Sequence, residues 1–136
     1  MSNMQTICRA IAAKGHKFAW HQPDWEQPGT RIVDPETGAA WRFTTWASIF
    51  DNSAAREIDC TAAGYAARQR ARAEGPDPTD ICTLNGLLGD KGQVRFDDGD
   101  GGGDWQAYID GYEASADTRA EAILRAYAAS KGVTCI

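Results

Sequence analysis

The first hydrophobic positions of the chain recur at helical spacing. Met4, Ile7 and Ile11 repeat at intervals of three and four residues, and Lys14-Gly15 supplies a stop signal. An α-helix turns once per 3.6 residues, so this spacing places the apolar side chains on one face. The sequence therefore predicts a short helix at the N-terminus.

Two segments in the middle of the chain carry the same pattern. Residues 53 to 74 are typical of an amphipathic helix that ends at Gly75-Pro76. The stretch Asp77-Pro78-Thr79-Asp80 combines an N-cap acid with a proline at the first helical position, and Gly89 closes the apolar repeat that follows. We expect one helix in each segment, and a single helical turn near Trp46.

Helical spacing returns in the last third of the chain. Four side chains follow it after a run of glycines: Trp105, Tyr108, Ile109 and Tyr112. Thr118 and Glu121 then have the spacing of a capping box, which predicts a final helix that ends at Lys131-Gly132. We thus expect helices on both sides of residue 115.

Alternating aromatic positions predict strands in the first third of the chain. Phe18 and Trp20 share one face of an extended segment, and so do Trp41 and Phe43. The turn residues DPETG favour a β-hairpin over residues 31 to 45. A further short strand is possible between Gln93 and Phe96.

These elements predict an α+β fold with four or five helices packed on a small antiparallel β-meander. The alternative is a mainly α fold with one β-hairpin, since the meander depends on one turn and two aromatic pairs. The chain has 136 residues, 43% of them hydrophobic and 10% aromatic. This is enough for a core, and we expect a single compact domain over residues 1 to 136.

The distribution of charge is uneven, because the acids are concentrated in the second half. Residues 1 to 76 carry nine Lys/Arg and eight Asp/Glu, whereas residues 77 to 136 carry five and eleven, giving +1 and −6 of the formal net charge of −5. An acidic region repels phosphates and attracts cationic surfaces. We therefore expect no direct binding to nucleic acid and a partner protein with a basic surface.

The most acidic stretch, RFDDGDGGGDW at residues 95 to 105, raises the question of a metal site. Its first acids match the opening of an EF-hand loop, but glycine falls at both the fifth and sixth positions and Ile109 takes the place of the final glutamate. We interpret the stretch as a flexible acidic connector before an aromatic helix, and expect no metal site.

No motif indicates a reaction or a cofactor. The four cysteines lack paired C-x-x-C spacing, and His16 and His21 fall on opposite faces of an extended segment. We expect reduced thiols, no catalytic residue, no cofactor and no membrane span, and predict a cytoplasmic protein. The oligomeric state is left open.

Two smaller features invite a functional interpretation. Arg68, Arg70 and Arg72 form a basic patch that could grip a phosphate, although pairing with acids of a neighbouring element is favoured. Trp25 lies in the polar loop HQPDWEQPG without a periodic hydrophobic partner, so we expect it to be exposed or interfacial.

The leading hypothesis is a non-enzymatic protein-binding module whose acidic surface occupies a basic, nucleic-acid-binding surface of another complex. The expected partner-binding residues are Asp97, Asp98, Asp100, Asp104, Trp105, Tyr108, Tyr112 and Trp25. The alternative is a small enzyme or ligand-binding domain with a pocket lined by His21, Trp25, Trp41 and Tyr65. In small size and lack of a catalytic signature the chain is similar to phage-encoded anti-defence proteins, including anti-CRISPR proteins, which implies an inhibitor but transfers no functional residue.

Overall fold

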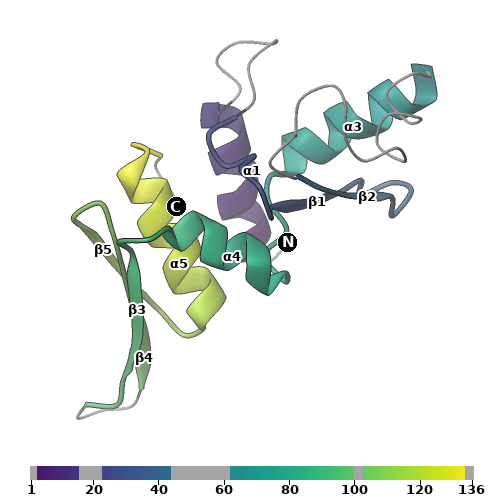
Figure 1. Ribbon diagram of the computed structural model, residues 1–136. Helices are drawn as coiled ribbons and strands as arrows, with labels where there is room; N and C mark the ends of the chain where they lie inside the picture. The colour runs from purple at the N-terminus through teal and green to yellow at the C-terminus, as the bar shows by residue number, and fades with distance from the viewer. Residues whose placement is uncertain (1–2, 16–22, 44–61, 100–102, 134–136) are drawn as a thin grey trace.

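The computed structural model describes residues 3–15, 23–43, 62–99 and 103–133, where the chain forms four helices and five strands (Figure 1). The α+β class predicted from the sequence is thereby confirmed. In chain order the elements are α1 (Asn3–Gly15), β1 (Arg31–Val33), β2 (Ala40–Arg42), α3 (Ala62–Glu74), α4 (Ile81–Leu88), β3 (Gln93–Asp97), β4 (Asp104–Ile109), β5 (Tyr112–Ala116) and α5 (Arg119–Ser130).

The predicted hairpin is present as the β1–β2 pair. Ile32 lies opposite Trp41, and Asp34 organises the turn by accepting a hydrogen bond from the Thr37 hydroxyl at 2.7 Å. Gly38 has a φ of 77°, a conformation that glycine adopts without strain. The strand expected at residues 18 to 20 and the helical turn near residue 46 lie outside the described residues.

A three-stranded antiparallel meander does occur, but it is formed by β3, β4 and β5 in that order. The helix expected over Trp105–Tyr112 is therefore wrong. Asp110 and Gly111, with φ of 51° and 84°, form a two-residue turn that pairs Ile109 with Tyr112. Two positive φ values are typical of the type I′ turn, whose twist matches that of a β-hairpin.

Helix α5 packs on one face of this meander and has α1 on its other side (Figure 1). Ile123 and Leu124 of α5 are fully buried, in the same core as Ala107 and Ile109 of β4. The Thr118 side chain accepts a hydrogen bond from the backbone N–H of Glu121 at 3.2 Å. The predicted start of this helix is confirmed.

Helix α4 begins later than the proline suggested. Its N-cap is Asp80, which accepts a hydrogen bond from the backbone N–H of Thr83 at 3.0 Å. Asp77 instead accepts a bond from the backbone N–H of Thr79 at 2.9 Å, within the turn that precedes the helix. Gly89 ends the helix, as expected.

The expectation that Trp25 is exposed or interfacial is wrong, because it is buried in the core with 1% of its surface exposed. The loop that carries it lies against the end of α1. A Cβ atom on Gly15 would come within 2.8 Å of Cβ of Pro23 and 3.2 Å of Nε1 of Trp25. The loop is polar in sequence, yet tertiary packing turns its one aromatic side chain inward, so Trp25 is removed from the predicted binding surface.

Candidate functional site

The acids of the first part of the chain are engaged in ion pairs. Every described Asp or Glu between residues 24 and 80 lies close to an arginine or lysine. The pairs are Asp24–Lys131, Glu26–Arg72, Asp34–Arg70, Glu36–Arg70, Glu74–Arg9, Asp77–Arg31 and Asp80–Arg42. Each of these carboxylates therefore has a cation beside it, although the side chains of Asp24 and Glu36 remain largely exposed.

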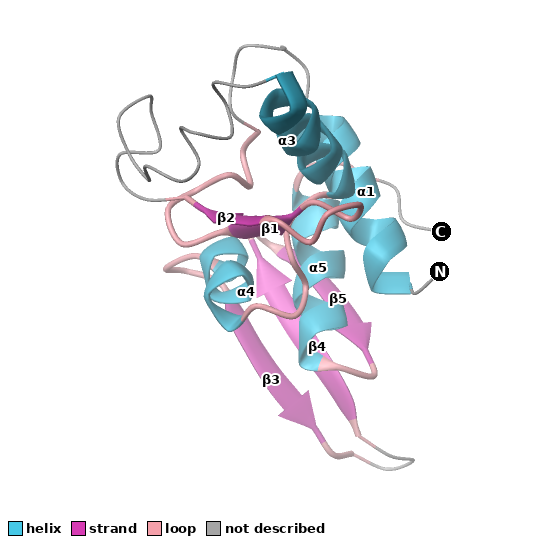
Figure 2. Cartoon of the chain, turned by 90° about the vertical axis from the view of Figure 1, so that its right-hand side faces the viewer, coloured by secondary structure: helices cyan, strands magenta, loops and turns pink. Residues whose placement is uncertain are grey.

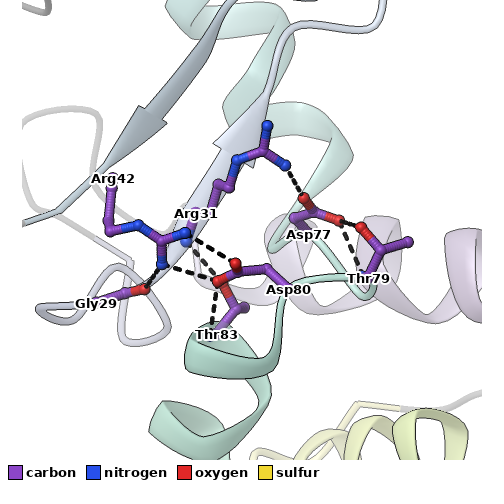
Figure 3. A network of polar contacts seen from close by, with 7 residues as sticks. All are labelled: Gly29, Arg31, Arg42, Asp77, Thr79, Asp80 and Thr83. Atoms are coloured by element: carbon purple, nitrogen blue, oxygen red, sulfur yellow. Dashed lines mark hydrogen bonds and ion pairs between the residues drawn. The ribbon is translucent and has the colours of Figure 1, made fainter.

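Two of these pairs tie the β1–β2 hairpin to the start of α4 (Figure 3). Arg42 contacts both carboxylate oxygens of Asp80 at 2.8 Å and also donates to the backbone carbonyl of Gly29 at 2.7 Å. The hydrogen bonds from Arg42 hold the pKa of Asp80 well below its usual range. Arg31 pairs with Asp77. This network connects the β1–β2 hairpin to the start of α4, so its charges stabilise the fold.

The basic patch of α3 serves the fold in the same way. Arg70 donates to Asp34 at 3.0 Å, and this bond is the main reason why the pKa of the buried Asp34 carboxyl falls to about 2. Arg72 donates to the buried Glu26 at 2.8 Å, and the Arg68 guanidinium lies 5.5 Å from the centre of the Phe43 ring. The expected pairing of this patch with acids of a neighbouring element is confirmed for Arg70 and Arg72.

The acids between residues 90 and 117 behave differently. The described acids of this stretch are Asp90, Asp97, Asp98, Asp104, Asp110, Glu113 and Asp117. All seven are exposed, and none of them forms an ion pair with a described residue. Glu121, which follows them in α5, pairs with Arg125 at 3.5 Å. The carboxylates that remain available to a partner are thus concentrated in the three-stranded sheet and its turns.

The outer face of the sheet, defined as the face turned away from α5, is polar. On β4 it carries Asp104, Gln106 and Tyr108, because side chains alternate between the two faces of a strand. Gln106 donates to Asp97 at 3.2 Å, and Arg95 lies 5.7 Å from the centre of the Tyr108 ring. Asp97 and Asp104 of the predicted set therefore share a face at the end of the β3–β4 hairpin.

The inner face, which meets α5, carries the apolar side chains. Trp105 on β4 and Tyr112 on β5 belong to it, whereas Tyr108 belongs to the outer face. The aromatic stripe that helical spacing predicted for these residues is therefore divided between two sides of a sheet. Trp105 lies at the hairpin end and Tyr112 beside the β4–β5 turn, so a small partner would not contact both.

Asp98 and Asp100 are the remaining acids of the predicted binding set. Asp98 is exposed directly after β3, and Asp100 lies outside the described residues. Phe96, which the sequence analysis did not single out, is 52% exposed and packs edge-on against Trp105. The signal that could have found it is the alternation of Val94 and Phe96 with polar residues, which is typical of a strand with one apolar face.

Neither a metal site nor the predicted aromatic pocket emerges from the part of the chain that the structure describes. No three His, Cys, Asp or Glu side chains within these ranges gather closely enough to hold a metal ion. Trp25 and Trp41 are buried in the core, whereas Tyr65 is 60% exposed. Hardly any surface of either indole is accessible to a ligand, and His21 lies outside the described residues.

No helix within the described ranges has the length and apolar character needed to cross a membrane. Comparisons with protein-family models, with curated proteins and with solved structures find no match for this chain. The functional argument therefore depends on the chemistry of the surface.

Proposed function

We propose that this protein is a non-enzymatic protein-binding module that occupies a basic, nucleic-acid-binding surface of a host complex. In this role it would act as an inhibitor of the kind that phages and mobile elements encode, and it would work in the cytoplasm. The supporting observation is the division of the acids: those up to residue 80 are paired internally, and those described from 90 to 117 are exposed without an ion pair to a described residue.

The acids at the hairpin end are the strongest part of this surface. We call Asp97, Asp98 and Asp104 the acidic tip. Figure 2 shows that the β3–β4 hairpin extends beyond the start of α5, so the acidic tip projects from the body of the molecule. Exposed charges act over a Debye length of about 8 Å at physiological salt. A projecting group of like charges therefore favours approach by a basic surface.

Binding by charge also explains why nucleic acid is not the expected ligand. The acidic tip would repel phosphates, but it could take their place on a protein that binds them, because steering depends on the sign and density of charge. The Asp97 and Asp104 side chains lie on one face, so their two charges are presented to a partner together. The proposed partner is therefore a protein that normally contacts a nucleic-acid backbone.

The test is capture of partners from a bacterial lysate at low and high salt. The variant Asp97→Asn/Asp104→Asn removes two charges from the acidic tip. The matched control Asp24→Asn/Glu36→Gln removes two charges from acids that are also exposed but paired, with side-chain exposures of 72% and 69%. The proposal expects a nucleic-acid-binding partner that the wild type and the control retain at low salt, and that high salt releases.

Loss of that partner in the tip variant alone would support the proposal. Equal capture by the tip variant and the wild type would contradict it, because the acidic tip would then have no part in binding. Equal losses in the tip variant and the control would also contradict it, since they would indicate a general effect of net charge.

A further inference from the structure

The apolar inner face of the sheet continues past the helix that covers it. Successive rows across the three strands are Ile109 with Tyr112, then Val94, Ala107 and Ala114, then Phe96, Trp105 and Ala116. Ala107 and Ile109 are buried, whereas Phe96 in the last row is 52% exposed. The row at the hairpin end is therefore an aromatic surface that the described part of the fold leaves partly in solvent.

The two rings in this row have a defined arrangement. Phe96 and Trp105 are direct cross-strand neighbours, and their ring centres are 5.3 Å apart with the planes inclined by 61°. In such an edge-to-face pair, each ring keeps at least one face that the other does not cover. Because Phe96 is 52% exposed, its ring offers a π-surface to an incoming group.

Gly103 makes this arrangement possible. A Cβ atom at residue 103 would lie 1.9 Å from Cζ of Phe96 and 2.7 Å from Cε2, which is far inside van der Waals contact. The end of the Phe96 ring thus occupies the space that any side chain at residue 103 would need. Gly103 thus leaves room for an aromatic ring, a role that the sequence did not predict.

Carboxylates flank the aromatic pair along the two strands. Asp97 follows Phe96 and Asp104 precedes Trp105, with both carboxylates on the outer face, and Asp98 is exposed directly after β3. The one cation beside these three acids in the described part of the hairpin is Arg95, whose guanidinium lies over the Tyr108 ring on the outer face. The local charge is therefore negative, and a cationic group would be attracted to the rings.

We propose that the Phe96–Trp105 pair receives an arginine side chain of the partner, which the negative field of the acidic tip attracts to this end of the hairpin. This inference rests on the proposed function, since it names the chemistry that the acidic tip recognises. Arginine is favoured over lysine because its planar, weakly hydrated guanidinium stacks on aromatic faces, whereas the ammonium of lysine stays more strongly hydrated. Charge alone would treat the two residues alike.

The experiment compares an arginine–glycine repeat peptide with the lysine–glycine peptide of the same length, each titrated into the full chain by calorimetry. We expect the wild type to bind the arginine peptide about two- to fivefold more tightly, which corresponds to an exposed cation–π contact. Phe96→Leu keeps an apolar side chain but removes the ring. It should bind both peptides with affinities that differ much less.

A second variant distinguishes loss of the ring contact from loss of the fold. Gly103→Ala displaces the Phe96 ring without removing it, and should also reduce the preference for arginine; circular dichroism checks the fold of both variants. Equal affinities of the wild type for the two peptides, or an undiminished preference in Phe96→Leu, would overturn the arginine inference while leaving the acidic tip in place. If neither peptide bound at low salt, the proposed function would fail together with the inference.

Discussion

Asp97 and Asp104 lie directly opposite each other in the β3–β4 pair. Like charges at directly opposed strand positions destabilise a sheet, and neither side chain forms an ion pair with a described residue. The Gln106 amide and the backbone N–H of Gly99 donate to Asp97 at 3.2 and 3.1 Å and partly offset this repulsion. The hairpin thus keeps an unfavourable pair at the position where we propose that a partner binds.

The first prediction concerns this pair. Asp104→Asn should stabilise the free protein by about 0.2–1 kcal/mol, because it relieves the repulsion across the strands. Thermal unfolding at low salt measures the effect, and added salt should reduce it by screening. A lower melting temperature for Asp104→Asn than for the wild type would show that the two carboxylates do not repel one another significantly.

Trp25 provides the second prediction, since its burial was not expected from the sequence. Trp25→Ala should lower the free energy of unfolding by about 3–5 kcal/mol, because a large buried side chain is lost and a cavity remains. Tyr65→Ala is the control: Tyr65 is 60% exposed, so its loss should change stability by about 0.5 kcal/mol or less. Denaturation in urea compares the two, and similar effects would contradict the burial of Trp25.

Acid should destabilise the protein through its paired carboxylates. The pKa of Asp34 is about 2 in the folded protein against an ordinary value of 3.8, mainly because of the hydrogen bond from Arg70. The folded state binds this proton less readily than the unfolded state, so the stabilisation is present above about pH 4 and is lost as the pH falls towards 2. The pKa of Asp80 is lowered in the same direction by Arg42.

Asp34→Asn separates this contribution from the others. The variant should be less stable than the wild type at pH 7, and it should lose less stability between pH 5 and pH 2. Melting temperatures over this pH range test both statements. Parallel pH profiles for the two proteins would mean that Asp34 does not couple folding to protonation.

The fourth prediction separates the two roles of Asp80, which caps α4 and pairs with Arg42. Asp80→Ala removes both and should destabilise more than Arg42→Ala, by about 1 kcal/mol for the cap. Asp80→Ser retains a capping oxygen, so its effect should resemble that of Arg42→Ala. Urea denaturation would reveal a mistaken assignment if serine and alanine at residue 80 were equally destabilising.

Where the sequence carries local chemistry, it predicted the structure well. The hairpin turn at DPETG, the N-cap at Thr118 and the stop at Gly75-Pro76 are each confirmed at or near their expected positions. Caps and turns depend on hydrogen bonds between residues a few positions apart, so a single sequence contains most of the information.

Spacing alone failed between residues 105 and 112. Positions separated by three and four residues lie on one face of a helix, but the same residues also fit two strands joined by a turn at Asp110-Gly111. That dipeptide is a strong hairpin signal, and it decides between the two structures when apolar positions alternate on both sides of it. The burial of Trp25 has no comparable local signal, because it follows from contact with a distant helix.

The acids of the tip and the acids paired with arginines are different residues, so the two sets could evolve separately. Substitutions at the acidic tip leave the ion pairs of Arg31, Arg42 and Arg70 untouched. Selection could therefore vary the tip residue by residue, in step with a changing target, without repeated loss of the fold. Substitutions among the paired acids would be constrained by their arginine partners, so the two sets should diverge at different rates.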